Sequence, residues 1–193
     1  MTVDQAGAFL SARGVTRDTA ISRHLGYVSE PAPGHERFKG WVAIPYVTNG
    51  GVVAMKFRCC KDHDCKAESC QRYDAPAGQK ARLYGAADLA SGGDVAAVVE
   101  GEFKAIVVSQ ELGIPAVSTS AGQWLEHWPR TLADFDRVLV IADNDDAGMK
   151  HAKDKVLKSL PQGRLVVPPS EHPKVDDWLH DVGADEVRKA IGL

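Results

Sequence analysis

The stretch DVAAVVEGEFKAIVVSQELG, residues 94–113, joins a short apolar run directly to a helical pattern. Its first part is apolar enough for a strand buried on both faces, as strands of parallel sheets are. The residues after Gly101 have helical spacing, and Gly113 suits the end of a helix. RVLVIADNDDAGMKHAKDKVLKSL, residues 137–160, repeats this order. Strands that alternate with helices predict an α/β domain with a mainly parallel sheet flanked by helices.

The chain before Ser91 has a different pattern. Two short helical segments at the N-terminus precede apolar runs at residues 42–46 and 52–57, which are joined by the hairpin signal TNGG. These features predict a small mixed α+β lobe. We therefore expect two domains, a basic α+β lobe over residues 1–92 and the α/β domain over residues 93–193.

Composition and charge are those of a globular protein. The 193 residues are 44% hydrophobic and 25% charged, and no apolar run approaches the roughly 20 residues that cross a bilayer. The N-terminus lacks the pattern of a signal peptide, so we expect a cytoplasmic protein without a membrane partner. Residues 56–82 hold seven bases against four acids, and residues 100–148 hold nine acids against three bases. This asymmetry suits a protein that holds a polyanion and chelates cations, although ordinary surface variation also explains it.

Acidic residues follow both predicted strands. Glu100 ends the first run, and Asp143 and Asp145 end the second. Ligands of open parallel sheets bind at the carboxyl ends of the strands, so adjacent strands would bring these carboxylates together. Mg²⁺ prefers such oxygen ligands, and two ions can activate an attacking hydroxyl and stabilise the leaving oxygen in phosphoryl transfer. The alternative is that the Asp residues only cap the helix that begins near Ala147.

These acidic segments resemble the signature motifs of a known domain. VVEGE at residues 98–102 and IADNDDAG at residues 141–148 are similar to the two motifs of the TOPRIM domain, which DnaG-type primases share with topoisomerases and several nucleases. Residues 9–28 and 40–58 resemble the N-terminal lobe of bacterial and phage primase cores. The resemblance covers roughly residues 5–180 and indicates the catalytic core of a DnaG-type DNA primase in a minimal, phage-like form.

The resemblance implies synthesis of short RNA primers from ribonucleoside triphosphates on a single-stranded DNA template, by metal-dependent nucleotidyl transfer. It assigns catalysis to Glu100, Asp143 and Asp145, which would bind two Mg²⁺ or Mn²⁺ ions together with Asp177, and Glu102 is a further candidate ligand. Basic residues would hold template or nucleotide, a solvated charged surface being the alternative. These residues are Lys56, Arg58, Arg72, Lys80, Arg82 and Lys104.

The sequence departs from the family pattern at two positions. Lys104 stands where primases usually carry an Asp, and Val175 stands where they carry a second acid near Asp177. Either Glu102 compensates or Lys104 contacts a phosphate. Fewer acids favour a weaker second metal site, so a catalytically weak TOPRIM nucleic-acid-binding module and a TOPRIM nuclease stay open as alternative functions.

The resemblance also bears on partners and location. We recognise no zinc ribbon, helicase domain or helicase-binding tail, and therefore expect a separate helicase or zinc-binding protein as a partner. The expected location is the cytoplasm of a bacterium or of a phage-infected bacterial host.

The segment RCCKDHDCKAESC, residues 58–70, holds all four cysteines of the chain. In a cytoplasmic protein these are thiols or metal ligands rather than disulfides. Thiolate and imidazole are the ligands of structural zinc, but paired Cys-x-x-Cys knuckles are lacking. The candidate ligands are Cys59, Cys60, His63, Cys65 and Cys70, and the alternative is a mobile loop of reduced thiols. His151, on the helix after the second acidic cluster, is predicted to be solvated.

Overall fold

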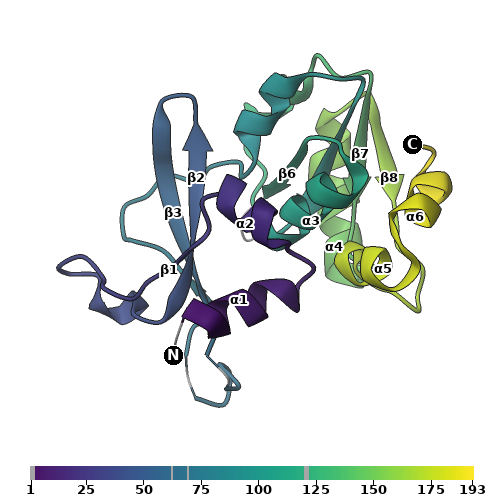
Figure 1. Cartoon of the computed structure of the whole chain (residues 1–193). Helices are drawn as coiled ribbons and strands as arrows, with labels where there is room; N and C mark the ends of the chain where they lie inside the picture. The colour runs from purple at the N-terminus through teal and green to yellow at the C-terminus, as the bar shows by residue number, and fades with distance from the viewer. Residues whose placement is uncertain (1–2, 62, 69, 120–121) are drawn as a thin grey trace. The chain divides into compact units, whose positions relative to one another are not determined.

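The computed structural model describes residues 3–61, 63–68, 70–119 and 122–193. The chain divides into two compact units, Met1–Lys80 and Ala81–Leu193 (Figure 1). Residues 81–92, which we assigned to the first lobe, pack within the second unit: Leu83 lies in its core and Tyr84 bridges to Ser118. The domain boundary near residue 92 stays a prediction. No helix among the described residues is long and apolar enough to span a membrane.

The first unit contains two short helices and an antiparallel sheet in the order β1-β2-β3-β4. The predicted hairpin is confirmed, with Thr48 of β2 paired to Gly51 of β3. The helices are α1 (Val3–Ser11), α2 (Arg17–Ser22) and the 3₁₀ turn η1 (Glu36–Phe38). The strands are β1 (Gly26–Tyr27), β2 (Trp41–Thr48), β3 (Gly51–Cys59) and β4 (Tyr73–Asp74).

An aromatic cluster forms the core beside this sheet. Phe38 and Phe57 stack with ring centroids 3.9 Å apart, and Trp41 meets Phe38 edge-on. Burial of such rings is a large contribution to the stability of a small unit. Cys59 is buried in the same cluster. The end of β3 is therefore fixed by packing at the point where the cysteine-rich loop begins.

The second unit is built on a four-stranded parallel sheet in the order β6-β5-β7-β8, which confirms the predicted sheet type. The chain runs from β5 outward to β6 and then returns to the other side of β5 for β7. Adjacent strands β5 and β7 therefore flank the point where the strand order reverses, which is where open α/β sheets bind ligands. The strands are β5 (Val95–Glu100), β6 (Ala116–Thr119), β7 (Arg137–Ile141) and β8 (Gly163–Val166).

Helices cover both faces of this sheet, as the apolar strands predict. The face of Val98 and Val140 packs against α4, the turns that follow it, and η3. The opposite face carries α3, with α5 and α6 beside it (Figure 1). The elements are η2 (Ala86–Ser91), α3 (Glu102–Leu112), η3 (Trp128–Leu132), α4 (Asp146–His151), the π-helical turn η4 (Ala152–Val156), η5 (Leu157–Ser159), α5 (Val175–Val182) and α6 (Ala184–Ile191).

The structure departs from a simple interpretation of the sequence at three places. The chain around Trp124 forms no helix among the described residues, and only the short turn η3 follows, with Pro129 at its start. The single helix expected over residues 146–160 is divided into α4, η4 and η5. Helix α5 was not foreseen, although Val175, Trp178 and Leu179 bury one face of it.

Candidate active site

The carboxyl ends of β5 and β7 bring two of the predicted acids together. Val98 lies opposite Val140 in the parallel register, so Glu100 at the end of β5 is level with the residue that precedes Asp143. Glu100 and Asp143 line one small hollow at the edge of the sheet. Residues from distant parts of the sequence thus meet at the reversal of strand order, as the strand-end argument requires.

Two glycines allow the backbone to turn and pack closely beside Glu100 and Asp143. Gly101 follows Glu100 with φ +90°, a conformation that favours glycine, and lets the chain turn at once into α3. Gly148 lies against the backbone of Asp143: a Cβ there would come within 2.8 Å of the Asp143 carbonyl oxygen. The first turn of α4 therefore packs directly on the acidic loop.

Asp145 has a capping role in the structure. Its Oδ1 accepts a hydrogen bond of 2.7 Å from the backbone N–H of Gly148, and Asp145 is the N-cap of α4. This contact satisfies one of the N–H groups that a helix start leaves without a partner. Capping was the alternative explanation for this residue. It engages one carboxylate oxygen, so the metal-ligand prediction for Asp145 rests on the other.

Lys104 and Asp143 form an ion pair inside the site. The ammonium group of Lys104, in the first turns of α3, donates to both carboxylate oxygens of Asp143. Only 14% and 16% of the two side chains are exposed. A carboxylate that is this well buried needs a counter-charge, and here the chain itself provides one. The resemblance described above predicts an acid at this position, and Lys104 instead supplies the positive partner of Asp143.

His151 is a site residue that the sequence interpretation missed. It is half-buried, lines the same hollow as Glu100 and Asp143, and its Nε2 lies 3.5 Å from Thr119 Oγ1. Burial lowers the pKa of His151, whereas the nearby charge of Glu100 acts in the opposite direction. The prediction that His151 is solvated is wrong. One helical turn separates it from Gly148, and that spacing was the available signal.

The remaining predicted metal ligands lie at the edges of this arrangement. Asp177 is exposed in the first turn of α5, and Glu102 is buried at the start of α3. Asn144 ties the acidic loop to the segment before α5: its backbone N–H donates to Pro173 and its side chain to Pro168. Neither Asp177 nor Glu102 lines the hollow, so their part in metal binding stays a prediction.

The basic residues of the first unit differ in their surroundings. Arg58 is buried and donates to the carbonyl oxygens of Cys59 and Arg72, so its guanidinium group holds the end of β3 to the chain before β4. Lys56 lies over the Tyr73 ring at 4.7 Å. Lys104 is engaged by Asp143, whereas three further basic side chains predicted to bind nucleic acid are exposed in their own units: Arg72, Lys80 and Arg82.

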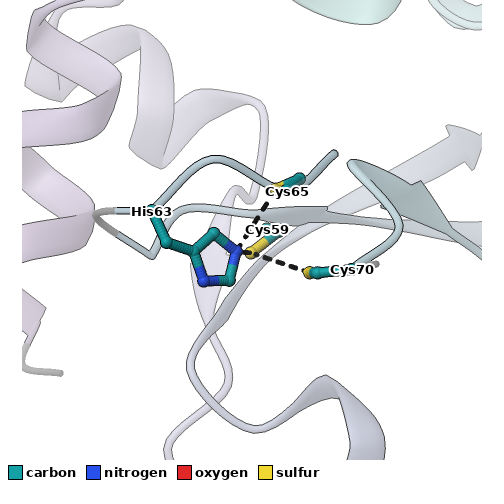
Figure 2. A group of neighbouring side chains, drawn as sticks. All are labelled: Cys59, His63, Cys65 and Cys70. Atoms are coloured by element: carbon teal, nitrogen blue, oxygen red, sulfur yellow. Dashed lines mark hydrogen bonds between the residues drawn. The ribbon is translucent and has the colours of Figure 1, made fainter. Parts of the chain in front are cut away.

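The cysteine-rich loop brings four of its five candidate ligands together. One ligand atom from each of Cys59, His63, Cys65 and Cys70 lies within 4.8 Å of every other (Figure 2). Cys60 is outside this group, and its thiol donates to the carbonyl oxygen of Gly40 at 3.2 Å. The fifth candidate is thereby separated from the other four.

The thiols of this cluster influence one another. Burial and then hydrogen bonding with Cys59 and Cys65 raise the pKa of the Cys70 thiol to about 11. Burial also acts to raise the pKa of Cys65, but hydrogen bonds with His63 and the two other cysteines outweigh it, so this pKa is lowered. One thiolate is thus favoured in the cluster and a second is opposed, as expected for like charges that are held close together.

The chain is similar in sequence to a phage protein. The chain is 31% identical to the gene 57 protein of Mycobacterium phage D29 over 160 residues, which span 80% of this chain and 99% of that protein. No protein-family model matches.

Solved structures give the fold. The zinc-binding and RNA polymerase domains of Aquifex aeolicus primase match with a TM-score of 0.79 and 20% identity over 97% of this chain. This chain spans only 55% of that Aquifex chain. The RNA polymerase domain of Mycobacterium tuberculosis primase DnaG matches with a TM-score of 0.73 and 18% identity, over 98% of this chain and 75% of that one. The primase fragment of the bacteriophage T7 primase-helicase matches with a TM-score of 0.69 and 21% identity, over 94% and 72%. The expected resemblance to DnaG-type catalytic cores is confirmed at the level of the fold.

Proposed function

We propose that this chain, which belongs to the family of the Mycobacterium phage D29 gene 57 protein and has the fold of DnaG-type primase cores, is a DNA primase core. It would synthesise short RNA primers on single-stranded DNA from ribonucleoside triphosphates. One observation carries the proposal: Glu100 and Asp143 line one hollow where the strand order reverses. Paired carboxylates at that edge suit a metal-dependent nucleotidyl transfer.

The donor set of the hollow fits a hard divalent cation. Carboxylate oxygens of Glu100 and Asp143 in the hollow, and the second oxygen of Asp145 at the start of α4, outside the lining of the hollow, are of the kind that Mg²⁺ or Mn²⁺ takes in phosphoryl-transfer sites. Two such ions would polarise the phosphates and the attacking hydroxyl. We include Asp177, on the exposed turn that follows the loop tied to Asn144, as a further ligand. Buried Glu102 is the weaker candidate.

Lys104 has two roles in this proposal. Without a cation its ammonium group neutralises Asp143 and holds the carboxylate in place. When a cation binds Asp143, the ammonium group is released within the same site, where it can contact a nucleotide phosphate. This exchange keeps the local charge balanced in both states. We place Lys104 with Lys56, Arg72, Lys80 and Arg82 in the group that binds nucleic acid or nucleotide, and we leave out Arg58 because its guanidinium group is used inside the first unit.

One observation also favours a second function. The Lys104–Asp143 pair lets the site exist without any cation, as a nucleic-acid-binding module of low catalytic activity would require. Such a module keeps its affinity for nucleic acid when Asp143 and Asp145 are replaced. A nuclease with the same site would instead cut nucleic acid without ribonucleotides.

The proposed partner and location are argued from the similar proteins. The T7 protein is a primase-helicase, and we propose that this chain acts with a separate helicase or zinc-binding protein. Its relative comes from a phage, which supports action in the cytoplasm of an infected bacterium.

The test is a primer-synthesis assay on single-stranded DNA with labelled ribonucleotides and either Mg²⁺ or Mn²⁺. Wild type should make short oligonucleotides, and Glu100→Gln and Asp143→Asn should each lower the rate by at least about 100-fold, since each removes a charged ligand at the reacting centre. Asp146→Asn is the matched control: this exposed acid is the first residue of α4 and lies outside the hollow, and its replacement should leave the rate within about two-fold. The absence of any product from wild type with both metals would refute the proposal. Cleavage of the template without ribonucleotides would assign the site to a nuclease.

A further inference from the structure

The loop between β3 and β4 carries a second cluster of ligand side chains, in the first unit. His63 Nε2 lies 3.5 Å from Cys59 Sγ and 3.4 Å from Cys65 Sγ, and Cys70 Sγ lies 3.7 Å from Cys59 Sγ (Figure 2). Cys59 ends β3, and the other three come from the irregular chain that follows it. This cluster shares no residue with the acidic site, and the inference below does not depend on the function proposed for that site.

These distances match those between ligands on one tetrahedral zinc ion. Zn–S bonds of about 2.3 Å and Zn–N bonds of about 2.0–2.1 Å, at tetrahedral angles, place two sulfurs about 3.7–3.8 Å apart and a sulfur and a nitrogen about 3.5 Å apart. The three distances within the cluster, 3.7, 3.5 and 3.4 Å, agree with this. A disulfide would need the sulfurs near 2.05 Å. None of the four cysteines, all of which lie among the described residues, forms a disulfide.

The remaining ring nitrogen of His63 supports the same assignment. His63 Nδ1 lies 3.0 Å from a carboxylate oxygen of Glu68. Zinc-bound histidines usually donate their second N–H to a carboxylate or carbonyl group, which fixes the tautomer and directs the other nitrogen to the metal. Glu68 is exposed, but backbone bonds hold its turn: Glu68 N–H donates to Asp64 at 3.0 Å and Cys70 N–H to Cys65 at 2.8 Å.

Cys60, which follows Cys59 directly, is not part of the cluster. Cys59 and Cys60 are consecutive at the end of an extended strand, so their side chains leave on opposite sides. Cys59 faces the loop, whereas the Cys60 thiol is buried and donates to Gly40. The structure thereby selects four ligands out of five candidates.

We propose that Cys59, His63, Cys65 and Cys70 bind one structural Zn²⁺ ion. Four protein ligands close the coordination sphere and leave no position for water or substrate, as in structural rather than catalytic zinc sites. The ion replaces the core that an irregular loop of this size lacks, and it connects the loop to the aromatic cluster of Phe38, Trp41 and Phe57, against which Cys65 and Cys70 pack.

The first experiment measures zinc in the full-length chain. Protein purified under reducing conditions from zinc-supplemented cells should contain one equivalent of zinc by elemental analysis. The Asp143→Asn variant should contain the same amount, because that acid belongs to the other unit. Cobalt exchanged into the protein should give the tetrahedral d–d bands and the thiolate-to-metal charge-transfer band of a sulfur-rich site. Wild type without zinc or without the thiolate band would overturn the proposal.

Substitutions test the ligand set. Cys65→Ser and Cys70→Ser should lose stoichiometric zinc, whereas Cys60→Ser should keep it, since serine can also donate to Gly40. Glu68→Gln should retain one zinc but bind it roughly 10-fold more weakly, the lower end for the loss of a group that orients a ligand. Equal loss of zinc in Cys60→Ser would refute the assignment.

Alkylation of wild type avoids variants that fail to fold. Zinc should protect Cys59, Cys65 and Cys70 from an alkylating reagent together, and removal of zinc by a chelator should expose all three at once. Mass spectrometry of peptides reads each cysteine separately. A protection pattern that does not change when the metal is removed would contradict the site. Primer synthesis is not part of either readout, so the two proposals succeed or fail separately.

Discussion

The ion pair between Lys104 and Asp143 allows a quantitative test of the acidic site. Removing one partner of a fully buried pair leaves the other charge without a counter-charge and costs about 3–5 kcal/mol. The two side chains keep 14% and 16% of their exposure, which lowers this cost. In metal-free protein we expect Lys104→Met to lower the free energy of unfolding by about 2–3 kcal/mol.

A double-mutant cycle separates the pair from its surroundings. Asp143→Asn alone should cost about 2 kcal/mol, because it leaves a buried ammonium group, and the double variant should cost less than the sum by about 2 kcal/mol. Lys189→Met is the matched control in the same unit. Lys189 pairs with Glu186 on the surface of α6, where both side chains are mostly exposed, so this change should cost at most about 0.5 kcal/mol.

Urea unfolding followed by tryptophan fluorescence measures these free energies. Three of the four tryptophans, at positions 124, 128 and 178, lie in the second unit and report on it. Mg²⁺ adds a second readout: since it must displace the ammonium group in wild type, it should stabilise Lys104→Met by about 1 kcal/mol more than wild type at the same concentration. A coupling energy below about 0.5 kcal/mol would refute the buried pair. Equal stabilisation of both proteins by Mg²⁺ would refute Asp143 as the ligand for which the two cations compete.

Three further changes test the geometry of the loop. Asp145→Ala should lower the free energy of unfolding by about 1 kcal/mol through loss of the α4 cap, and Asp145→Asn should not, which urea denaturation checks. Gly148→Ala should cost about 1–2 kcal/mol in the same assay, because the new Cβ meets the Asp143 backbone; an unchanged midpoint would contradict that contact. The pKa of His151 is lowered chiefly by burial, so the folded state disfavours protonation of this side chain. The free energy of unfolding therefore has its full value above the ordinary pKa of 6.5 and decreases as the pH falls below it. Metal-free wild type should therefore lose more unfolding free energy than His151→Gln between about pH 7.5 and 5.5, and an equal or smaller loss would contradict this.

The sequence was most informative where one physical cause dominates. The runs that became β5 and β7 are apolar throughout because both faces of these strands are covered, and that pattern predicted a parallel sheet. Strand direction then placed Glu100 and Asp143 at the same edge of the sheet, and the structure supplies the condition that β5 and β7 are adjacent. Helix α5 was missed because its apolar positions, Val175, Trp178 and Leu179, are separated by acids that resemble a polar loop.

Contacts between distant elements could not be predicted in the same way. Lys104 and Asp143 are 39 positions apart, and their pairing depends on how the first turns of α3 lie over the end of β7. His151 looked solvated because its sequence neighbours are charged, whereas its burial is decided by which face of α4 packs on the acidic loop. The choice of Cys59 over Cys60 as a ligand likewise requires the orientation of β3.

A lysine and a divalent cation can each neutralise the negative charge of the carboxylates at this site. Glu100 and Asp143 both line the hollow, and two carboxylates without a counter-charge repel one another there. An acid at the position of Lys104 would make the arrangement dependent on metal. The lysine instead neutralises Asp143 before any cation binds, so a cation that binds Asp143 must displace the ammonium group. The same substitution therefore predicts both a metal-free site that is well ordered and a weaker affinity for the cation, and the double-mutant cycle with and without Mg²⁺ measures these two consequences separately.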